Sequence, residues 1–171
     1  WDRNAPLPQS SEKLIQWSEA RDIILDSFSS FHPEISNLAE LFFKNNWIDA
    51  SLRKGKASGA FAHPSVPSLH PYILVNYQGK IRDVMTLAHE LGHGVHQILA
   101  GKNGLLMAET PLTLAETASV FGEMLVFRKL LDESSIAQKK QLLSGKIEDM
   151  LNTVARQIGF HQFEVKFHEA R

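Results

Sequence analysis

The chain has 171 residues, 43% of them hydrophobic and 22% charged, and a formal net charge of −1. These values are typical of a soluble domain with a sizeable core, and they argue against nucleic acid or an anionic membrane surface as the main partner. Because the sequence contains no cysteine, disulfides, thiolate nucleophiles and cysteine-ligated zinc are excluded.

The apolar runs and the first residue bear on location and completeness. No apolar run approaches the roughly 18 residues that a membrane-spanning helix needs, and no signal-peptide pattern is present. A cysteine-free chain suits a reducing cytoplasm, so a cytoplasmic location without a membrane partner is predicted. The chain opens at Trp1 rather than Met. We therefore expect an internal piece or a trimmed form of a longer protein, with N- and C-terminal parts of the parent chain missing.

The first half of the chain combines helices with a small β element. A helical lead-in is predicted over residues 1–48, with residues 1–11 extended, helical stretches over residues 12–31, and a helix from Pro33 to about residue 46. A loop and edge-strand region follows over residues 49–80. It contains a short strand over residues 58–62 and a β-branched, aromatic strand over residues 72–77.

Three helices are predicted over residues 81–171. The first covers residues 82–100 and ends at Gly101, and the second covers residues 110–131, with Thr110 as N-cap and Pro111 at the first helical position. The third begins near residue 134 and is expected to bury an apolar stripe of Leu142, Leu143, Ile147, Leu151, Val154, Ile158, Phe163 and Phe167. The expected fold class is therefore mainly α with a small β element.

Residues 89–93 spell HELGH, which matches the HExxH metal-binding motif. On a helix, His89 and His93 lie about 40° apart and one turn from each other, so both imidazoles reach one ion. Glu90 lies about 100° around from His89, where it reaches a water on the metal more easily than the metal itself. The rest of this helix has an apolar face opposite a polar one that carries both histidines, which favours a cleft-facing site.

A catalytic zinc site needs a third protein ligand, which here must be His, Asp or Glu. His96 lies on the same helical face one turn further on, but one helix cannot easily wrap three such residues around an ion. Glu116 lies in the next helix among apolar and small neighbours, where a carboxylate is expected to be paired or metal-bound. Glu116 is therefore preferred, and His96 is expected to orient a ligand or face substrate. Glu123 is either a carboxylate that orients a ligand histidine or one member of an ion pair elsewhere.

Several segments together resemble a known enzyme family. They are LAHELGHGVHQ at residues 87–97, ETP at 109–111, LAETASVFGE at 114–123, RKGKASGAF at 53–61, HPYILVNY at 70–77 and WDR at 1–3. This combination resembles the oligoendopeptidase F group of the thimet oligopeptidase-like zinc metallopeptidases, over most of the chain. The resemblance implies a zincin-like catalytic core of a helical metallopeptidase, with residues 1–171 as a single partial catalytic domain.

The resemblance also implies roles for individual residues. It assigns one zinc ion to His89, His93 and Glu116, the catalytic base to Glu90, and substrate pairing to the edge strand around Gly59, Ala60 and Phe61. Members of the family are several times longer, enclose a deep channel, and act on short peptides. The expected function is zinc-dependent endopeptidase cleavage of oligopeptides. The alternatives are a non-catalytic zinc-holding unit and a metallocarboxypeptidase.

Two weaker patterns are interpreted conservatively. His161, Glu164 and His168 could form a second metal site, but a polar helix face is the preferred interpretation. The basic run around Arg53 and Lys56 could grip a peptide carboxylate, but a solvated loop is preferred.

Overall fold

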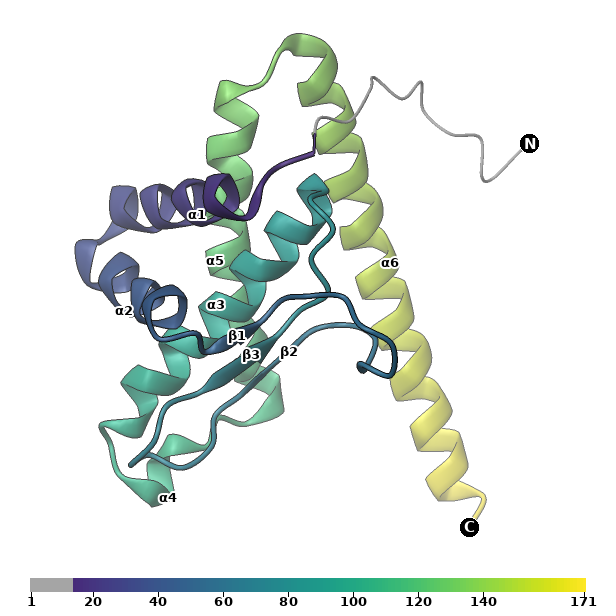
Figure 1. The fold of residues 1–171 in the computed structure, drawn as a ribbon. Coiled ribbons are helices and arrows are strands. Elements are labelled where there is room, and N and C mark those ends of the chain that lie inside the picture. The colour runs from purple at the N-terminus through teal and green to yellow at the C-terminus, as the bar shows by residue number, and fades with distance from the viewer. Residues whose placement is uncertain (1–13) are drawn as a thin grey trace. The chain divides into compact units, whose positions relative to one another are not determined.

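The computed structural model describes residues 14–171, so the extended segment expected over residues 1–11 lies outside the described residues. The described part confirms a mainly helical fold with one small sheet (Figure 1). Its helices are α1 (Trp17–Phe31), α2 (Pro33–Lys44), α3 (Ile81–Gly101), α4 (Leu105–Ala108), α5 (Leu112–Glu133) and α6 (Ile136–Glu169), and its strands are β1 (Ile48–Asp49), β2 (Phe61–His63) and β3 (Tyr72–Leu74).

The described residues fall into two compact units, divided between Leu130 and Leu131. The first unit holds α1 to α4, the sheet and most of α5. The second unit is built around α6, which begins after Ser135, whose hydroxyl accepts a hydrogen bond from the backbone N–H of Gln138. No helix in residues 14–171 combines the length and the apolar character that crossing a membrane requires. The cytoplasmic location stays a prediction.

The core of the first unit forms around α3. The apolar face expected on this helix is buried, and α1 and α2 pack side by side and also contact α3. The sheet lies against α3 through β2 and β3. The largest fully buried apolar side chains in this core are Ile24, Phe28, Phe42, Ile73, Val84, Leu87, Leu91 and Val126. Burial of this face leaves the histidine face of α3 partly open.

The sheet has the order β1-β3-β2, so β2 is an edge strand. β1 pairs parallel to β3, and β2 pairs antiparallel to it with Ala62 opposite Ile73. Ile73 N–H donates to Trp47 O at 2.9 Å, on the β1 side of the strand. In an antiparallel pair the residue opposite such a position directs its own N–H and C=O away from the partner strand. The main chain of Ala62 therefore points toward the outer edge of the sheet.

Both predicted strands differ in extent from the observed ones. β2 begins at Phe61 rather than at residue 58, because Gly59 has φ +86° and cannot continue a strand. The Asn76 side chain holds this turn by donating to the carbonyl oxygens of Ala57 and Gly59. β3 ends at Leu74 instead of residue 77. The two-residue strand β1 and the four-residue helix α4 were not predicted.

Two expectations about burial are wrong. None of the residues of α6 is buried, so the apolar stripe expected to be buried there is exposed or half-exposed. The loop expected around Arg53 and Lys56 is observed, and the Arg53 side chain is 56% exposed, but solvation of Lys56 is wrong. The Lys56 side chain is 2% exposed and its ammonium group donates to Asp49 Oδ1 and to the carbonyl oxygens of Asp49, Ser51 and Val75. Arg53 makes two hydrogen bonds to the Asp49 carboxylate, at 2.7 and 2.6 Å.

Candidate metal centre

The structure places His89 and His93 on one face of α3, as their spacing predicts. Their rings are 5.1 Å apart between centroids and nearly perpendicular, and their side chains are 26% and 17% exposed. The opposite face of the helix is held in the core by Leu87 and Leu91. The two imidazoles are therefore fixed in position and still accessible.

A close contact between α3 and α5 brings the second part of the site to these histidines. A Cβ atom at Gly92 would lie 2.6 Å from the Ala118 carbonyl oxygen and 2.8 Å from Ser119 Cα. A Cβ atom at Gly122 would lie 3.0 Å from the Ala88 carbonyl oxygen. Only glycine fits at such distances between backbones, so Gly92 and Gly122 set the spacing of the two helices.

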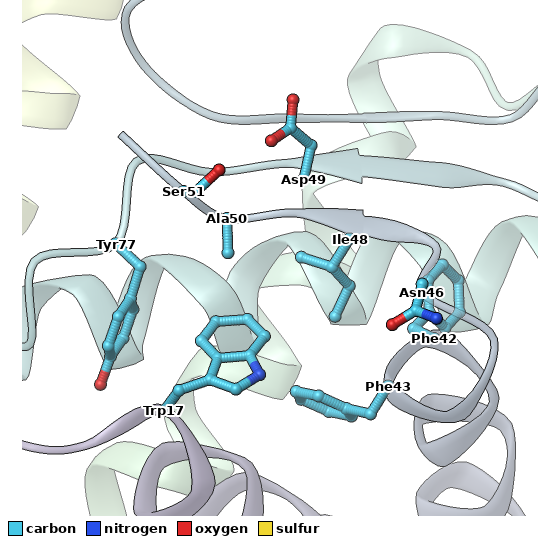
Figure 2. A pocket seen from close by; sticks show the side chains of 9 residues that line it. All are labelled: Trp17, Phe42, Phe43, Asn46, Ile48, Asp49, Ala50, Ser51 and Tyr77. Carbon is cyan, nitrogen blue, oxygen red and sulfur yellow. The ribbon is translucent and has the colours of Figure 1, made fainter. Parts of the chain in front are cut away.

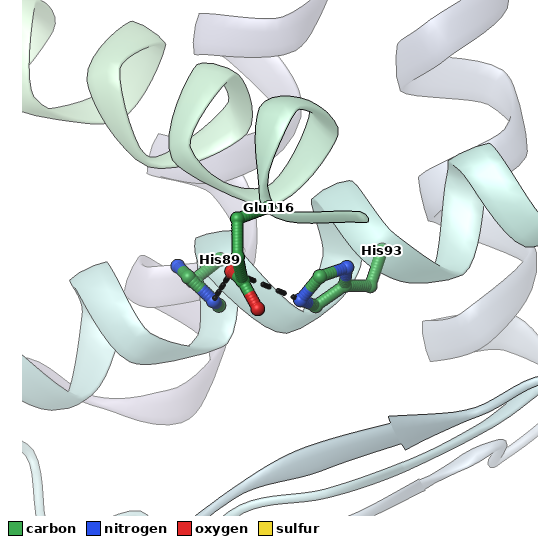
Figure 3. Close-up of side chains that lie close together, drawn as sticks. All are labelled: His89, His93 and Glu116. Atoms are coloured by element: carbon green, nitrogen blue, oxygen red, sulfur yellow. Dashed lines mark ion pairs between the residues drawn. The ribbon is translucent and has the colours of Figure 1, made fainter. Parts of the chain in front are cut away.

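Glu116 extends from α5 toward both imidazoles (Figure 3). Its Oε2 atom lies 3.1 Å from His89 Nε2 and 3.4 Å from His93 Nε2. The three ligand atoms all lie within 4.8 Å of one another. Ligands about 2.0–2.2 Å from a tetrahedral zinc ion lie about 3.4 Å from each other. This donor set therefore fits a zinc ion with little rearrangement, although the Glu116 side chain is 64% exposed rather than enclosed by apolar neighbours as its sequence context predicted.

Two further residues support the group. His89 Nδ1 lies 3.2 Å from Glu123 Oε2, which leaves Nε2 of the same ring directed at Glu116. Of the two interpretations left open for Glu123, contact with His89, a candidate ligand, is the one observed. Ser119 is fully buried, and its hydroxyl donates to Glu116 Oε2 at 2.7 Å. No role in the site was predicted for Ser119, and its position one turn after Glu116 was the available signal.

Burial and neighbouring charges shift the pKa values of this cluster. Burial raises the pKa of Glu90 to about 7, and the Glu116 charge adds to the rise while His89 opposes it. Burial lowers the pKa of His93 and outweighs the attraction of Glu116. For His89, burial acts downward but is outweighed by the Glu123 hydrogen bond and nearby carboxylates, so its pKa is raised. A carboxyl group that titrates near neutrality is suited to exchanging protons with substrate.

The edge strand is connected to α3. Gln97, two turns after His89 on α3, donates from Nε2 to the Ala62 carbonyl oxygen at 3.3 Å. Ala60 is half-buried, and Gly59 and Phe61 are exposed. His96 is half-buried on α3 and does not join the three-ligand group. Within residues 14–171 no second such group forms, so His161, Glu164 and His168 do not make one.

An open pocket of about 430 Å³ lies elsewhere in the first unit (Figure 2). Trp17 forms part of its wall, with Phe43 and Tyr77 in ring contact at centroid distances of 5.7 and 5.2 Å. None of the predicted site residues lines it. The chemistry therefore has to be sought at the histidines and not in this hollow.

Comparison with known proteins identifies the family. The model of peptidase family M3 matches residues 19–171. The chain belongs to this family. It is 35% identical over 141 residues to "Oligoendopeptidase F, chromosomal" of Lactococcus lactis subsp. cremoris. This alignment covers 81% of the present chain and 23% of the relative. It is 34% identical over 173 residues to an oligoendopeptidase F homolog of Borreliella burgdorferi, covering 99% of this chain and 29% of that one.

A solved structure agrees with the M3 assignment. A Chlamydophila abortus protein described as a peptidase aligns with a TM-score of 0.79 and 34% sequence identity, over 94% of this chain and 27% of that chain. These matches confirm the predicted resemblance. They also show that the chain spans only about a quarter of the length of the relatives it matches.

Proposed function

We propose that this chain carries the zinc site and the catalytic base of a metalloendopeptidase that hydrolyses peptide bonds in short oligopeptides. The observation that carries the proposal is that Glu116 Oε2 lies 3.1 Å from His89 Nε2 and 3.4 Å from His93 Nε2, beside a buried Glu90. Membership of peptidase family M3 and the oligoendopeptidase relatives support the same activity. We propose one zinc ion per chain.

Zinc is the metal that this donor set favours. Two imidazoles and one carboxylate are a ligand set of catalytic zinc sites, in which the fourth position stays open. The contact between His89 Nδ1 and Glu123 is the arrangement that fixes the tautomer of a ligand histidine and raises its basicity. When bound there, zinc supplies Lewis acidity, which lowers the pKa of water to about 7 and polarises the scissile carbonyl.

Glu90 is the proposed base. Its carboxyl group has a pKa raised to about 7 mainly by burial, so it takes a proton from the attacking water without being locked in the ionised state. It then passes that proton to the leaving amine. Glu90 follows directly after His89 on α3, so the rigid helix that positions the imidazoles also positions the base.

The proposed substrate lies along β2. A peptide in extended conformation would pair with the outward main-chain groups of Ala62, while Gly59 and Ala60 lead into the strand. In the absence of a peptide, Gln97 on α3 donates to the Ala62 carbonyl oxygen, so a pairing peptide N–H would compete with Gln97 for that oxygen. Oligopeptides are the proposed partners, and this strand is their proposed main-chain contact.

Two observations weigh against the alternatives. A site that only holds zinc has no need of a buried carboxylate with a pKa near neutrality beside its ligands. A carboxypeptidase needs a cation for the terminal carboxylate, and Arg53, in the loop before the edge strand, is already committed to Asp49 by two hydrogen bonds. Endopeptidase cleavage is therefore the preferred function.

The test separates ligand from base. We expect Glu90→Gln to keep zinc but to lose nearly all hydrolysis of a quenched-fluorescent peptide. Glu116→Ala should weaken zinc binding itself, and Glu40→Gln, which removes an exposed carboxylate paired with Lys44 on α2, should change neither. Zinc is measured by elemental analysis. Retained turnover in Glu90→Gln would overturn the base, and loss of zinc in Glu90→Gln but not in Glu116→Ala would exchange the two roles.

A further inference from the structure

Ser119 is a fully buried polar residue that the proposed reaction does not use. It lies on α5 one turn after Glu116, and its hydroxyl donates to Glu116 Oε2 at 2.7 Å and lies 3.1 Å from the Glu116 carbonyl oxygen. Oε2 is also the oxygen that faces His89 Nε2 and His93 Nε2. The serine therefore contacts the one carboxylate atom on which the three-ligand group depends.

The two ends of this hydrogen bond differ in their freedom. The Glu116 side chain is 64% exposed, and a long exposed side chain samples several rotamers. Ser119, in contrast, is held against α3, because its Cα atom lies only 2.8 Å from the place that a Cβ atom on Gly92 would take. A fixed donor beside a mobile carboxylate selects the rotamers that bring an oxygen to that donor. The selected rotamer here is the one directed at both imidazoles.

We propose that Ser119 is a positioning residue that holds the Glu116 carboxylate in its metal-binding orientation. This inference rests on the zinc site proposed above. The hydroxyl donates its single proton to Oε2, and a carboxylate oxygen keeps a further lone pair for a cation. Outer partners of this kind typically contribute about 10–100-fold to metal affinity. The competing explanation is that position 119 only needs a small residue where α3 and α5 approach each other.

Zinc affinity distinguishes the two explanations, because alanine is small but cannot donate. We expect Ser119→Ala to bind zinc about 10–100-fold more weakly than the unaltered chain, in competition with a chromophoric chelator. The matched control is Ser27→Ala, which removes another buried serine hydroxyl, bonded to Ile23 O within α1. It should leave zinc affinity unchanged. Equal affinity of Ser119→Ala and the unaltered chain would overturn the proposal.

A double-mutant cycle excludes a general packing defect. If Ser119 acts through Glu116, adding Ser119→Ala to Glu116→Ala should cause no further loss of zinc affinity, whereas a packing defect would lower it again. Should Ser119→Ala fail to fold, Ser119→Gly is used, since glycine is also small and cannot donate from a side chain, and the same loss of zinc affinity is expected. Failure of the zinc site itself has a different signature: the unaltered chain and His93→Ala would then bind zinc equally weakly.

Discussion

The cluster around Asp49 contains its own permanent cations, whereas the ion-pair partners of Glu116 within the described residues are imidazoles. Asp49 is matched by Arg53 and by the buried ammonium group of Lys56, and the donors of Lys56 are used by nearby oxygens. Around His89, three ligand atoms face each other across a space that suits a cation. The charges of the first cluster are paired within the protein, so it has a structural role. The second cluster is suited to holding a metal.

The comparison predicts that zinc stabilises the chain through the second cluster alone. At a free zinc concentration of 1,000 times Kd, binding adds about 4 kcal/mol to the free energy of unfolding, which corresponds to a rise in Tm of roughly 8–16 °C for a chain of this size. His93→Ala should abolish most of this rise. Lys56→Met should lower Tm with and without zinc but keep the difference between them. Thermal unfolding with added zinc or EDTA measures Tm for both variants. A rise in Tm with zinc that persists in His93→Ala would contradict the assignment of the zinc site.

The second prediction concerns how each cluster is assembled. The cluster of His89, His93 and Glu116 depends on the contact of two helices, while the Asp49 cluster is built from neighbouring segments. Gly92→Ala should lower the free energy of unfolding by about 1–3 kcal/mol, because the new methyl group meets the backbone of Ala118 and Ser119 and must push α5 away. Zinc affinity should also fall, because Glu116 on α5 moves away from the two histidines on α3. Gly145→Ala is the matched control, since a Cβ atom there meets nothing within 4 Å on α6 and should be neutral or slightly stabilising. An unchanged zinc affinity in Gly92→Ala would show that the contact is dispensable.

The third prediction uses the pH dependence of the Asp49 cluster. Hydrogen bonds from Arg53, and then from Lys56, hold the pKa of Asp49 well below its usual range. Because its pKa is near 3.9 in an unfolded chain, the stabilisation is complete above about pH 5 and decreases as the pH falls toward the folded-state pKa. Asp49→Asn should therefore be less stable at neutral pH and lose less stability on acidification. Urea unfolding at several pH values tests this, and zinc affinity at neutral pH should not change. If Asp49→Asn lost stability on acidification as steeply as the unaltered chain, the proposed role of the Asp49 carboxylate would be contradicted.

The sequence predicted the local parts of the site better than the long-range ones. His89 and His93 were recognisable because their spacing within one helix brings them together without any other contact. The bonds from Ser119 to Glu116 and from Gln97 to Ala62 depend on how packed backbones orient side chains, which no spacing rule gives. Lys56 was assigned to a solvated loop because charge alone predicts exposure, and its burial arises only where oxygens of Asp49, Ser51 and Val75 converge.

The smallest expected effect concerns Gln97 and the edge strand. Gln97 Nε2 occupies the carbonyl oxygen of Ala62, and its Oε1 atom is buried without a hydrogen-bond partner in residues 14–171. A peptide pairing with β2 brings its own N–H to that carbonyl and competes with this donor. Gln97→Met keeps the length of the side chain but removes the amide. Because a hydrogen bond contributes about 0.5–1.5 kcal/mol net, this change should lower KM for a peptide about 2–10-fold, with kcat little changed. A peptide N-methylated at the residue that pairs with Ala62 should show no such gain, since it has no N–H to offer. A higher KM in Gln97→Met would mean that the amide contacts the peptide instead of competing with it.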